Sequence, residues 1–339
     1  ESGLEYVSRN DTRPIEGTYR PLTSAQEWRW NTKLQFKQAF GLNGNLTYRS
    51  LQSFQQQSNA NTGNTLLGRI DLNTAIWKGL ARATTTYELG SGQEPKLEFT
   101  YIRVAPGEGV YIWQDSLYNG DGIIQPNEMD IAPFQDQANY IRVATITDQY
   151  IRNNYVNWNQ SVNLDPRARW FNAKTGLKSY LKTLAFQSSW RISRKVQDNE
   201  QALSWNPLAL NLSDTNLVAA SANGRHVLFI NRASPKWEIQ VGNTDTRSKL
   251  VQTTGFESRS LREYFVQGRW NLNKVLSLRL NVARGLRTAD SELFNNKDFR
   301  LQFQKWEPQL TWQPASDFRS IFQYRYQTDQ NTLEQTPTG

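Results

Sequence analysis

The chain has 339 residues, of which 37% are hydrophobic, and 39 basic against 31 acidic residues give it a net charge of +8. Cysteine is absent, which excludes disulfides, thiolate metal sites and cysteine nucleophiles. The 12 Trp, 14 Tyr and 15 Phe argue against a disordered chain, and no segment approaches the roughly 18 apolar residues of a membrane-spanning helix.

A strand pattern follows a polar N-terminal segment. Residues 1–26 include Pro14 and Pro21 and are predicted to form a tail or an entry strand. From Trp28 to Phe36, every second residue is apolar or Thr, and the residues between them are Arg, Asn, Lys and Gln. Successive side chains of a strand point to opposite faces, so this segment predicts a strand with one apolar and one polar side.

The same alternation recurs in segments of about ten residues, the length of a membrane-crossing strand. Turn residues at 42–45 and 90–92 are expected to separate the early strands. The predicted strands cover 28–40, 42–54, 66–77, 80–89, 97–104, 150–162, 170–181, 184–192, 227–231, 237–243, 250–254, 264–272, 275–284, 299–312 and 318–326.

Two irregular stretches interrupt this rhythm. Residues 105–146 are rich in Gly and Pro and are predicted to form a long rim loop, and residues 197–223 form a second irregular loop. Residues 331–339 read as a polar tail. These boundaries place a single β-domain at 27–330.

The segments together predict an all-β fold. The expected architecture is an antiparallel, transmembrane-type β-barrel of roughly 12 to 16 strands, or part of a larger barrel, with long rim loops. An open sheet of this size would leave strand edges that invite aggregation, so closure is expected.

The loop at 105–146 contains a calcium-type pattern, Asn119-Gly120-Asp121-Gly122-Ile123-Ile124 followed by Glu128. An EF-hand loop uses side-chain oxygens at positions 1, 3 and 5, Gly at 6, a backbone carbonyl at 7 and a bidentate Glu at 12. Asn119, Asp121, Gly122, the Ile123 carbonyl and Glu128 fit positions 3, 5, 6, 7 and 12.

The first ligand of this pattern is displaced. Position 1 is Leu117, and Asp115 could replace it only if Ser116 and Leu117 bulge out of the loop. We therefore expect a structural calcium site made by Asp115, Asn119, Asp121, Ile123 and Glu128, which would offset the entropy of ordering a long loop. The alternative is a Gly-Asp-Gly turn beside a solvated Glu128.

Three motifs carry a resemblance to a known family: Gly107-Glu108-Gly109-Val110-Tyr111-Ile112-Trp113, Asn119-Gly120-Asp121-Gly122 and Phe134-Gln135-Asp136-Gln137-Ala138-Asn139-Tyr140-Ile141-Arg142. The chain resembles large, mostly uncharacterised outer-membrane β-barrel proteins of the Bacteroidota. The resemblance implies a location in the bacterial outer membrane. Members are usually longer, so the chain is expected to be a carboxy-terminal part.

Catalytic signatures are missing from the sequence. There is no Gly-x-Ser-x-Gly elbow and no phosphate-binding Gly-Lys-Ser loop. His226 is the only histidine, so we expect a surface or packing role for it. The predicted role is therefore non-enzymatic, in surface binding, transport or envelope export.

The expected partners are outer-membrane lipid, lipopolysaccharide and other envelope proteins. Nucleic acid is not expected, because the basic residues are spread along the polar strand faces and not clustered. One alternative is a soluble secreted adhesin or glycan-binding module, whose Trp and Tyr would stack on sugars. A second is a β-rich glycoside hydrolase that uses two carboxylates.

Overall fold

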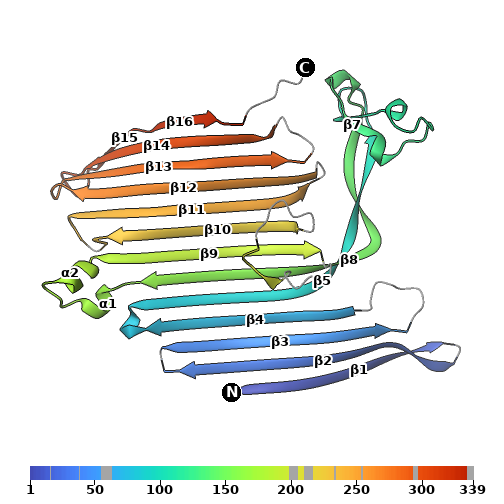
Figure 1. The fold of residues 1–339 in the computed structure, drawn as a ribbon, viewed down its shortest axis with the longest axis horizontal. Helices are drawn as coiled ribbons and strands as arrows, with labels where there is room; N and C mark the ends of the chain where they lie inside the picture. Colours follow the sequence, from blue (N-terminus) through green and yellow to red (C-terminus); the bar gives the residue numbers. More distant parts are fainter. Residues whose placement is uncertain are drawn as a thin grey trace.

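The computed structural model describes residues 1–15, 17–37, 39–54, 63–197, 205–209, 217–232, 234–252, 255–292 and 297–333. Most of these residues belong to one antiparallel sheet, which has 16 strands in the described part of the chain (Figure 1). This confirms the predicted all-β fold.

The strands lie in the sheet almost in chain order. They are β1 (Ser2–Ile15), β2 (Thr18–Phe36), β3 (Phe40–Ser53), β4 (Gly63–Ile76), β5 (Ala81–Arg103), β8 (Tyr140–Leu164), β9 (Leu184–Gln197), β10 (Leu217–Ile230), β11 (Trp237–Gln252), β12 (Gly255–Asn271), β13 (Leu276–Ser291), β14 (Phe299–Trp312), β15 (Ser320–Gln323) and β16 (Tyr326–Asn331).

The sheet is open within the described residues. The pairing path begins at β1 and ends where β14 pairs with both β15 and β16. Figure 1 shows β1 and β16 at opposite edges of the sheet. The described strands therefore do not close a barrel by themselves, in contrast to the closure expected from the sequence. An open sheet agrees with the second form of that prediction, in which the chain is part of a larger barrel.

One face of the sheet, here called the apolar face, carries most of the large hydrophobic side chains. In an antiparallel sheet, cross-strand partners lie on the same face, so the registers assign every strand to it. Its exposed members include Leu4, Tyr6, Trp28, Trp30, Leu34, Phe36, Leu46, Tyr48, Ile70, Leu228, Val241, Tyr264, Val266, Trp270, Trp306 and Trp312.

These side chains form a band that crosses the strands obliquely. In β2 the apolar band runs from Trp28 to Phe36, whereas in β14 it runs from Trp306 to Trp312. The hydrogen-bonding row that contains Phe36 passes through Ser188 in β9 and reaches Gln304 in β14. Phe36 is the last residue of the band in β2, whereas Gln304 lies outside the band in β14. The band therefore does not follow a single hydrogen-bonding row, and the strands are tilted relative to it.

The opposite face, here called the polar face, carries networks of ion pairs. Arg69 lies 2.8 Å from Asp71 and 2.6 Å from Glu88 on the neighbouring strand. Glu307 pairs in the same way with Lys305 and with Arg325. The alternating sequence therefore builds a single-layer sheet with one apolar and one polar surface.

Two strands extend beyond their neighbours. β4 pairs with β5 only as far as Gly90, and β9 pairs with β8 only from Asn153 onward. The remaining residues of β5 and β8 pair with each other, and β6 joins them only at Tyr140. Figure 1 shows this two-stranded arm leaving the sheet and ending in a small folded tip beside β7 (Met129–Ile131).

Two predicted turns are wrong. Residues 42–45 lie inside β3, and residues 90–92 lie inside β5. Gly90 is tolerated there because the Tyr155 ring lies over it, at the position a Cβ would occupy, and the Ser91 hydroxyl accepts a hydrogen bond from Leu66 N–H. Glycine in a strand here marks a place for a neighbouring ring, and not a chain reversal.

The predicted strand at 170–181 is also wrong. This stretch contains the end of helix α1 (Arg167–Trp170) and helix α2 (Leu177–Leu181), which starts after Gly176 with φ 76°. The apolar residues there are spaced for a helical turn as well as for a strand, and no neighbouring strand pairs with them. No helix in the described residues is long and apolar enough to cross a membrane.

Domain boundaries also differ from the prediction. Of the two alternatives for residues 1–26, the entry strand holds and the tail does not, because β1 pairs with β2 along its length, and β2 already begins at Thr18. The second irregular loop ends earlier than expected, since β10 begins at Leu217. The expected tail at 331–339 falls largely outside the described residues.

Candidate metal centre

The tip of the arm has its own small hydrophobic core. Tyr111 of β6 (Tyr111–Trp113), Met129 of β7 and Tyr140 of β8 are buried against one another, and Tyr101 packs on them. The rings of Tyr101 and Tyr111 meet edge to face with centroids 5.1 Å apart. Because β6 pairs with β7, the loop between them is closed at its base.

The displaced first ligand is accommodated by a local turn. Asp115–Leu117 forms one turn of 3-10 helix, in which Tyr118 N–H and Gly120 N–H both donate to the Asp115 carbonyl. This turn takes up the two extra residues, Ser116 and Leu117, that the sequence required to bulge. As a result, the Asp115 carboxylate faces the rest of the loop.

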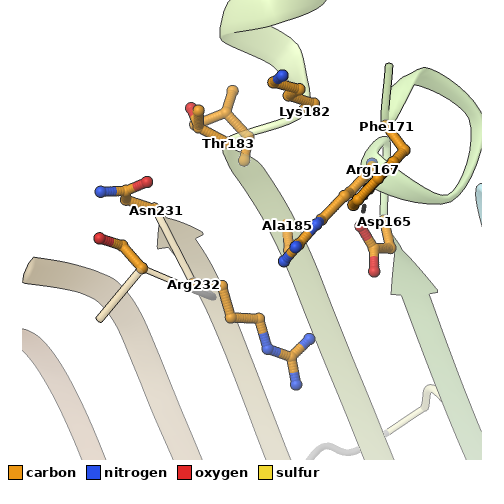
Figure 2. A pocket seen from close by; sticks show the side chains of 10 residues that line it. Asp165, Arg167, Phe171, Lys182, Thr183, Ala185, Asn231 and Arg232 are labelled. Atoms are coloured by element: carbon orange, nitrogen blue, oxygen red, sulfur yellow. Dashed lines mark hydrogen bonds between the residues drawn. The ribbon is translucent and has the colours of Figure 1, made fainter. Parts of the chain in front are cut away.

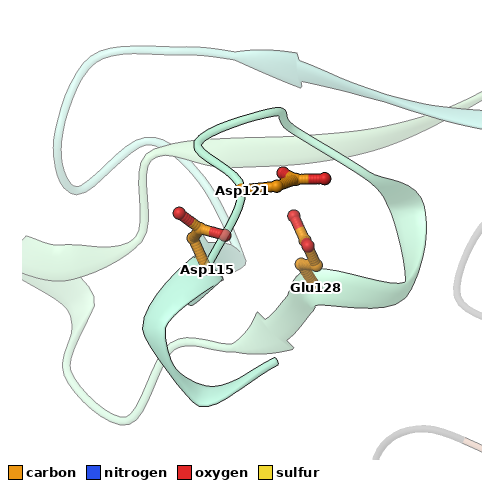
Figure 3. Close-up of side chains that lie close together, drawn as sticks. All are labelled: Asp115, Asp121 and Glu128. Carbon is orange, nitrogen blue, oxygen red and sulfur yellow. The ribbon is translucent and has the colours of Figure 1, made fainter. Parts of the chain in front are cut away.

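The turn brings three predicted ligands together. Asp115, Asp121 and Glu128 each present a carboxylate oxygen, and these oxygens lie within 4.8 Å of one another. Figure 3 shows the three carboxylates directed toward a common space from separate parts of the loop. Glu128 is fully buried at the base of the loop, Asp115 is half-buried and Asp121 is exposed.

Glu128 is oriented by two donors. Its Oε2 accepts hydrogen bonds from Trp113 Nε1 at 2.8 Å and from Gln125 N–H at 3.2 Å. Its Oε1 is buried and has no hydrogen-bond partner in the described residues, and the same holds for Asp115 Oδ1. A buried carboxylate oxygen without a partner is costly, so these two atoms are the candidate ligand positions of the cluster.

The loop backbone supplies the remaining hydrogen bonds. Asp115 Oδ2 accepts from Gly122 N–H at 3.0 Å, and Asp121 Oδ1 accepts from Ile123 N–H at 2.7 Å. Gly122 has φ 74° and Gly120 has φ 67°, conformations that favour glycine. These local hydrogen bonds and glycine conformations hold the Asp115 and Asp121 carboxylates close to Glu128.

Asn119 and Ile123 lie beside the cluster in a different way. The Asn119 amide nitrogen donates to Asp121 Oδ2 at 3.1 Å, and its Oδ1 accepts from Asp121 N–H. Ile123 contacts the cluster through its N–H. The structure thus brings together the three carboxylates of the predicted set, and places Asn119 and Ile123 as their hydrogen-bond partners.

Two residues of the site were not foreseen from the sequence. Trp113 holds Glu128 from β6, and Gln125 adds a hydrogen bond from Nε2 to Asp121 Oδ2 at 2.8 Å. A helix-start signal could have identified Gln125. It is followed by Pro126 and, three residues later, by Glu128, and the structure forms a short 3-10 turn there, Pro126–Glu128. Trp113 had no comparable signal.

Tyr118 lies at the edge of the same loop. Its hydroxyl donates to Asp130 Oδ1 at 3.0 Å, and this hydrogen bond to a carboxylate raises the pKa of the Tyr118 phenol.

The cluster of Asp115, Asp121 and Glu128 offers only oxygen donors, which suits hard cations such as Ca²⁺ and does not suit zinc.

A second candidate lies at the opposite end of the strands. Arg167, Lys182 and Arg232 surround a hollow of about 530 Å³, with buried Ala185 as its floor. Figure 2 shows Arg167 and Arg232 extending over the strands on either side of Ala185. Asp165 is the carboxylate that lines this hollow, so its lining is basic.

His226 has a packing role in the structure. Its Nδ1 lies 2.7 Å from the Ser188 hydroxyl on β9, and its ring packs on Trp190 with centroids 4.9 Å apart. These contacts fit the expectation for a lone histidine.

No known protein family and no curated protein matches the chain.

Proposed function

We propose that this chain forms part of the wall of a large outer-membrane β-barrel, with a non-enzymatic role in surface binding, transport or envelope export. The observation that carries the proposal is the apolar band. The sheet presents an oblique belt of Trp, Tyr, Leu and Val on one face, exposed on β1–β4, β10–β12 and β14, and ion-paired side chains on the other. Lipid outside and water inside would satisfy both faces.

The height of the band fits a bilayer. In β2 it extends from Trp28 to Phe36. At about 3.3 Å per residue and a tilt of about 40°, this corresponds to roughly 20 Å, close to the roughly 25 Å apolar belt of outer-membrane barrels.

Aromatic residues are concentrated at both edges of the band, as in the girdles of membrane barrels. The edge nearer the arm carries Trp28, Tyr48, Tyr264 and Trp306, and the far edge carries Phe36, Trp270 and Trp312. Aromatic rings with a polar edge favour the membrane–water interface. Between these edges the exposed residues are mainly aliphatic.

A soluble adhesin or hydrolase would need to cover this face. Monomeric soluble proteins seldom expose contiguous apolar patches above a few hundred Å². In the described part of the chain, no strand or helix lies over the band, and only residues 205–209 reach this face, where the Tyr87 hydroxyl donates to the Trp205 carbonyl oxygen and the Arg194 guanidinium donates to the Asn206 carbonyl oxygen. The membrane therefore explains the exposed face more simply than either soluble alternative.

The connections suggest an orientation. Outer-membrane barrels have short periplasmic turns and longer extracellular segments. The arm of β5 and β8 leaves the sheet at the end opposite the turn between Phe36 and Phe40. We place the arm on the outside of the cell, where lipopolysaccharide and other envelope proteins would be its neighbours.

The experiment uses two adjacent positions of β13. The full chain, which has no cysteine, is reconstituted into lipid vesicles as Leu280→Cys or Arg279→Cys and spin-labelled. We expect the label at 280 to be accessible to oxygen dissolved in lipid, and the label at 279 to be accessible to a water-soluble nickel complex, because the two side chains lie on opposite faces. Equal accessibility of both labels to the nickel complex would contradict the proposal.

A further inference from the structure

We propose that the arm tip binds one calcium ion through Asp115, Asp121 and Glu128. This inference concerns the tip alone and does not depend on the membrane proposal, because the tip has its own core and its own strand pair.

The buried oxygen of Glu128 is the observation that separates this site from an ordinary acidic cluster. Glu128 is 0% exposed, its Oε1 has no hydrogen-bond partner in the described residues, and its carboxylate points toward Asp115 and Asp121 (Figure 3). The carboxylates of a surface cluster would be solvated, whereas Glu128 Oε1 is shielded from solvent and accepts no hydrogen bond from the described residues.

The charges of the cluster favour the same conclusion. None of the three carboxylates forms an ion pair with a described Lys or Arg side chain, although the chain has an excess of basic residues. Three negative charges within 4.8 Å repel one another, and a divalent cation at their centre reverses that repulsion.

The type of ligand set suits calcium better than magnesium. Calcium binds six to eight oxygen atoms at about 2.3–2.6 Å in flexible geometry, which carboxylates from separate parts of one loop can provide. Magnesium demands near-octahedral geometry at about 2.0–2.1 Å, usually keeps several waters and is seldom held by protein carboxylates alone. The exposed position of Asp121 leaves one side of the cluster open for water ligands.

Binding is measured on the full chain folded in detergent, after removal of metal with a chelator. Calorimetry with CaCl₂ should give one site per chain, with a dissociation constant on the order of 10⁻⁴ to 10⁻³ M, the range of extracellular calcium modules. Terbium, used in place of calcium, should luminesce when Trp113 is excited, because the indole contacts the ligand Glu128.

Two ligand variants and two matched controls test the assignment. Glu128→Gln and Asp115→Asn keep the side-chain shape but remove a charge, and each should weaken calcium binding at least tenfold. Glu108→Gln and Asp136→Asn change exposed residues of the same tip outside the cluster and should bind as the parent chain does.

A folding defect is separated from loss of a ligand by proteolysis. Chymotrypsin should cut after exposed Tyr118 more slowly when calcium is added to the parent chain, and calcium should give no protection in Glu128→Gln. Absence of binding in the parent chain at millimolar calcium would overturn the proposal. Undiminished binding in both ligand variants, or tighter binding of magnesium than of calcium, would also overturn it.

Discussion

At the scale of single residues, glycines on the polar face make room for aromatic rings. A Cβ at Gly285 would lie 2.6 Å from the Phe303 ring and 2.4 Å from the Arg262 carbonyl oxygen, and Gly242 is covered by Phe265 in the same way. Phe265 and Phe303 are buried by this arrangement although the face around them is polar. The rings protect the glycine backbone and recover apolar contacts that glycine lacks.

This packing predicts that Gly285→Ala destabilises the folded sheet by about 1–3 kcal/mol, because the added methyl displaces a ring and a backbone carbonyl. Gly41→Ala is the control, since a Cβ at Gly41 meets nothing within 4 Å. Urea unfolding of both variants in lipid, compared with the parent chain, measures the difference. Equal stability of the two variants would show that the rings move aside without cost.

At the scale of elements, we expect the arm tip to behave as a separate cooperative unit. Its core of Tyr111, Met129 and Tyr140 has no contact with the other buried clusters of the described residues, and it lies at the far end of a two-stranded arm. A pair of strands alone is marginally stable, so the tip core and the loop ligands must hold this end together.

Met129→Ala should therefore loosen the tip without affecting the sheet. Removing a buried Met side chain costs roughly 2–5 kcal/mol of folding free energy, and we expect this to exceed the stability that so small a core provides. Hydrogen exchange should rise in peptides from 105–139 and stay unchanged in β11–β13. Ile131→Ala, an exposed position of the same strand, is the control and should leave both regions unchanged. Faster exchange throughout the sheet would contradict independent folding of the tip.

At the scale of the whole molecule, the oblique band determines how the sheet would sit in a bilayer. Phe36 and Gln304 share one hydrogen-bonding row and one face, yet Phe36 lies at the edge of the band and Gln304 lies beyond it. Strands that tilt by tens of degrees from the barrel axis produce this offset, which accumulates from strand to strand.

We therefore expect spin labels at Phe36→Cys and Gln304→Cys to report different environments in lipid vesicles. The label at 36 should be accessible to oxygen at the lipid interface, and the label at 304 should be accessible to the water-soluble nickel complex. Strands that cross the bilayer without tilt would give both labels the same accessibility. Equal accessibility would reject the tilted arrangement. It would not bear on which face meets lipid, which the labels at positions 279 and 280 of β13 test.

Local patterns in the sequence determined much of the fold. Period-two alternation predicted which side of β2 and β13 is apolar, because strand geometry alone sends neighbouring side chains to opposite faces. The spacing of Asn119, Asp121 and Glu128 likewise predicted a loop with convergent oxygens, since the turn chemistry of the glycines is local.

The remaining features were decided by contacts between residues distant in the sequence. Gly90 lies in a strand and not in a turn because Tyr155 covers it, and 170–181 is not a strand because no neighbour pairs with it. The burial of Glu128 depends on β6 pairing with β7, and the open edges depend on the order of all the strands. Sequence periodicity specifies the face of each strand, but only the assembled sheet determines which partners cover it.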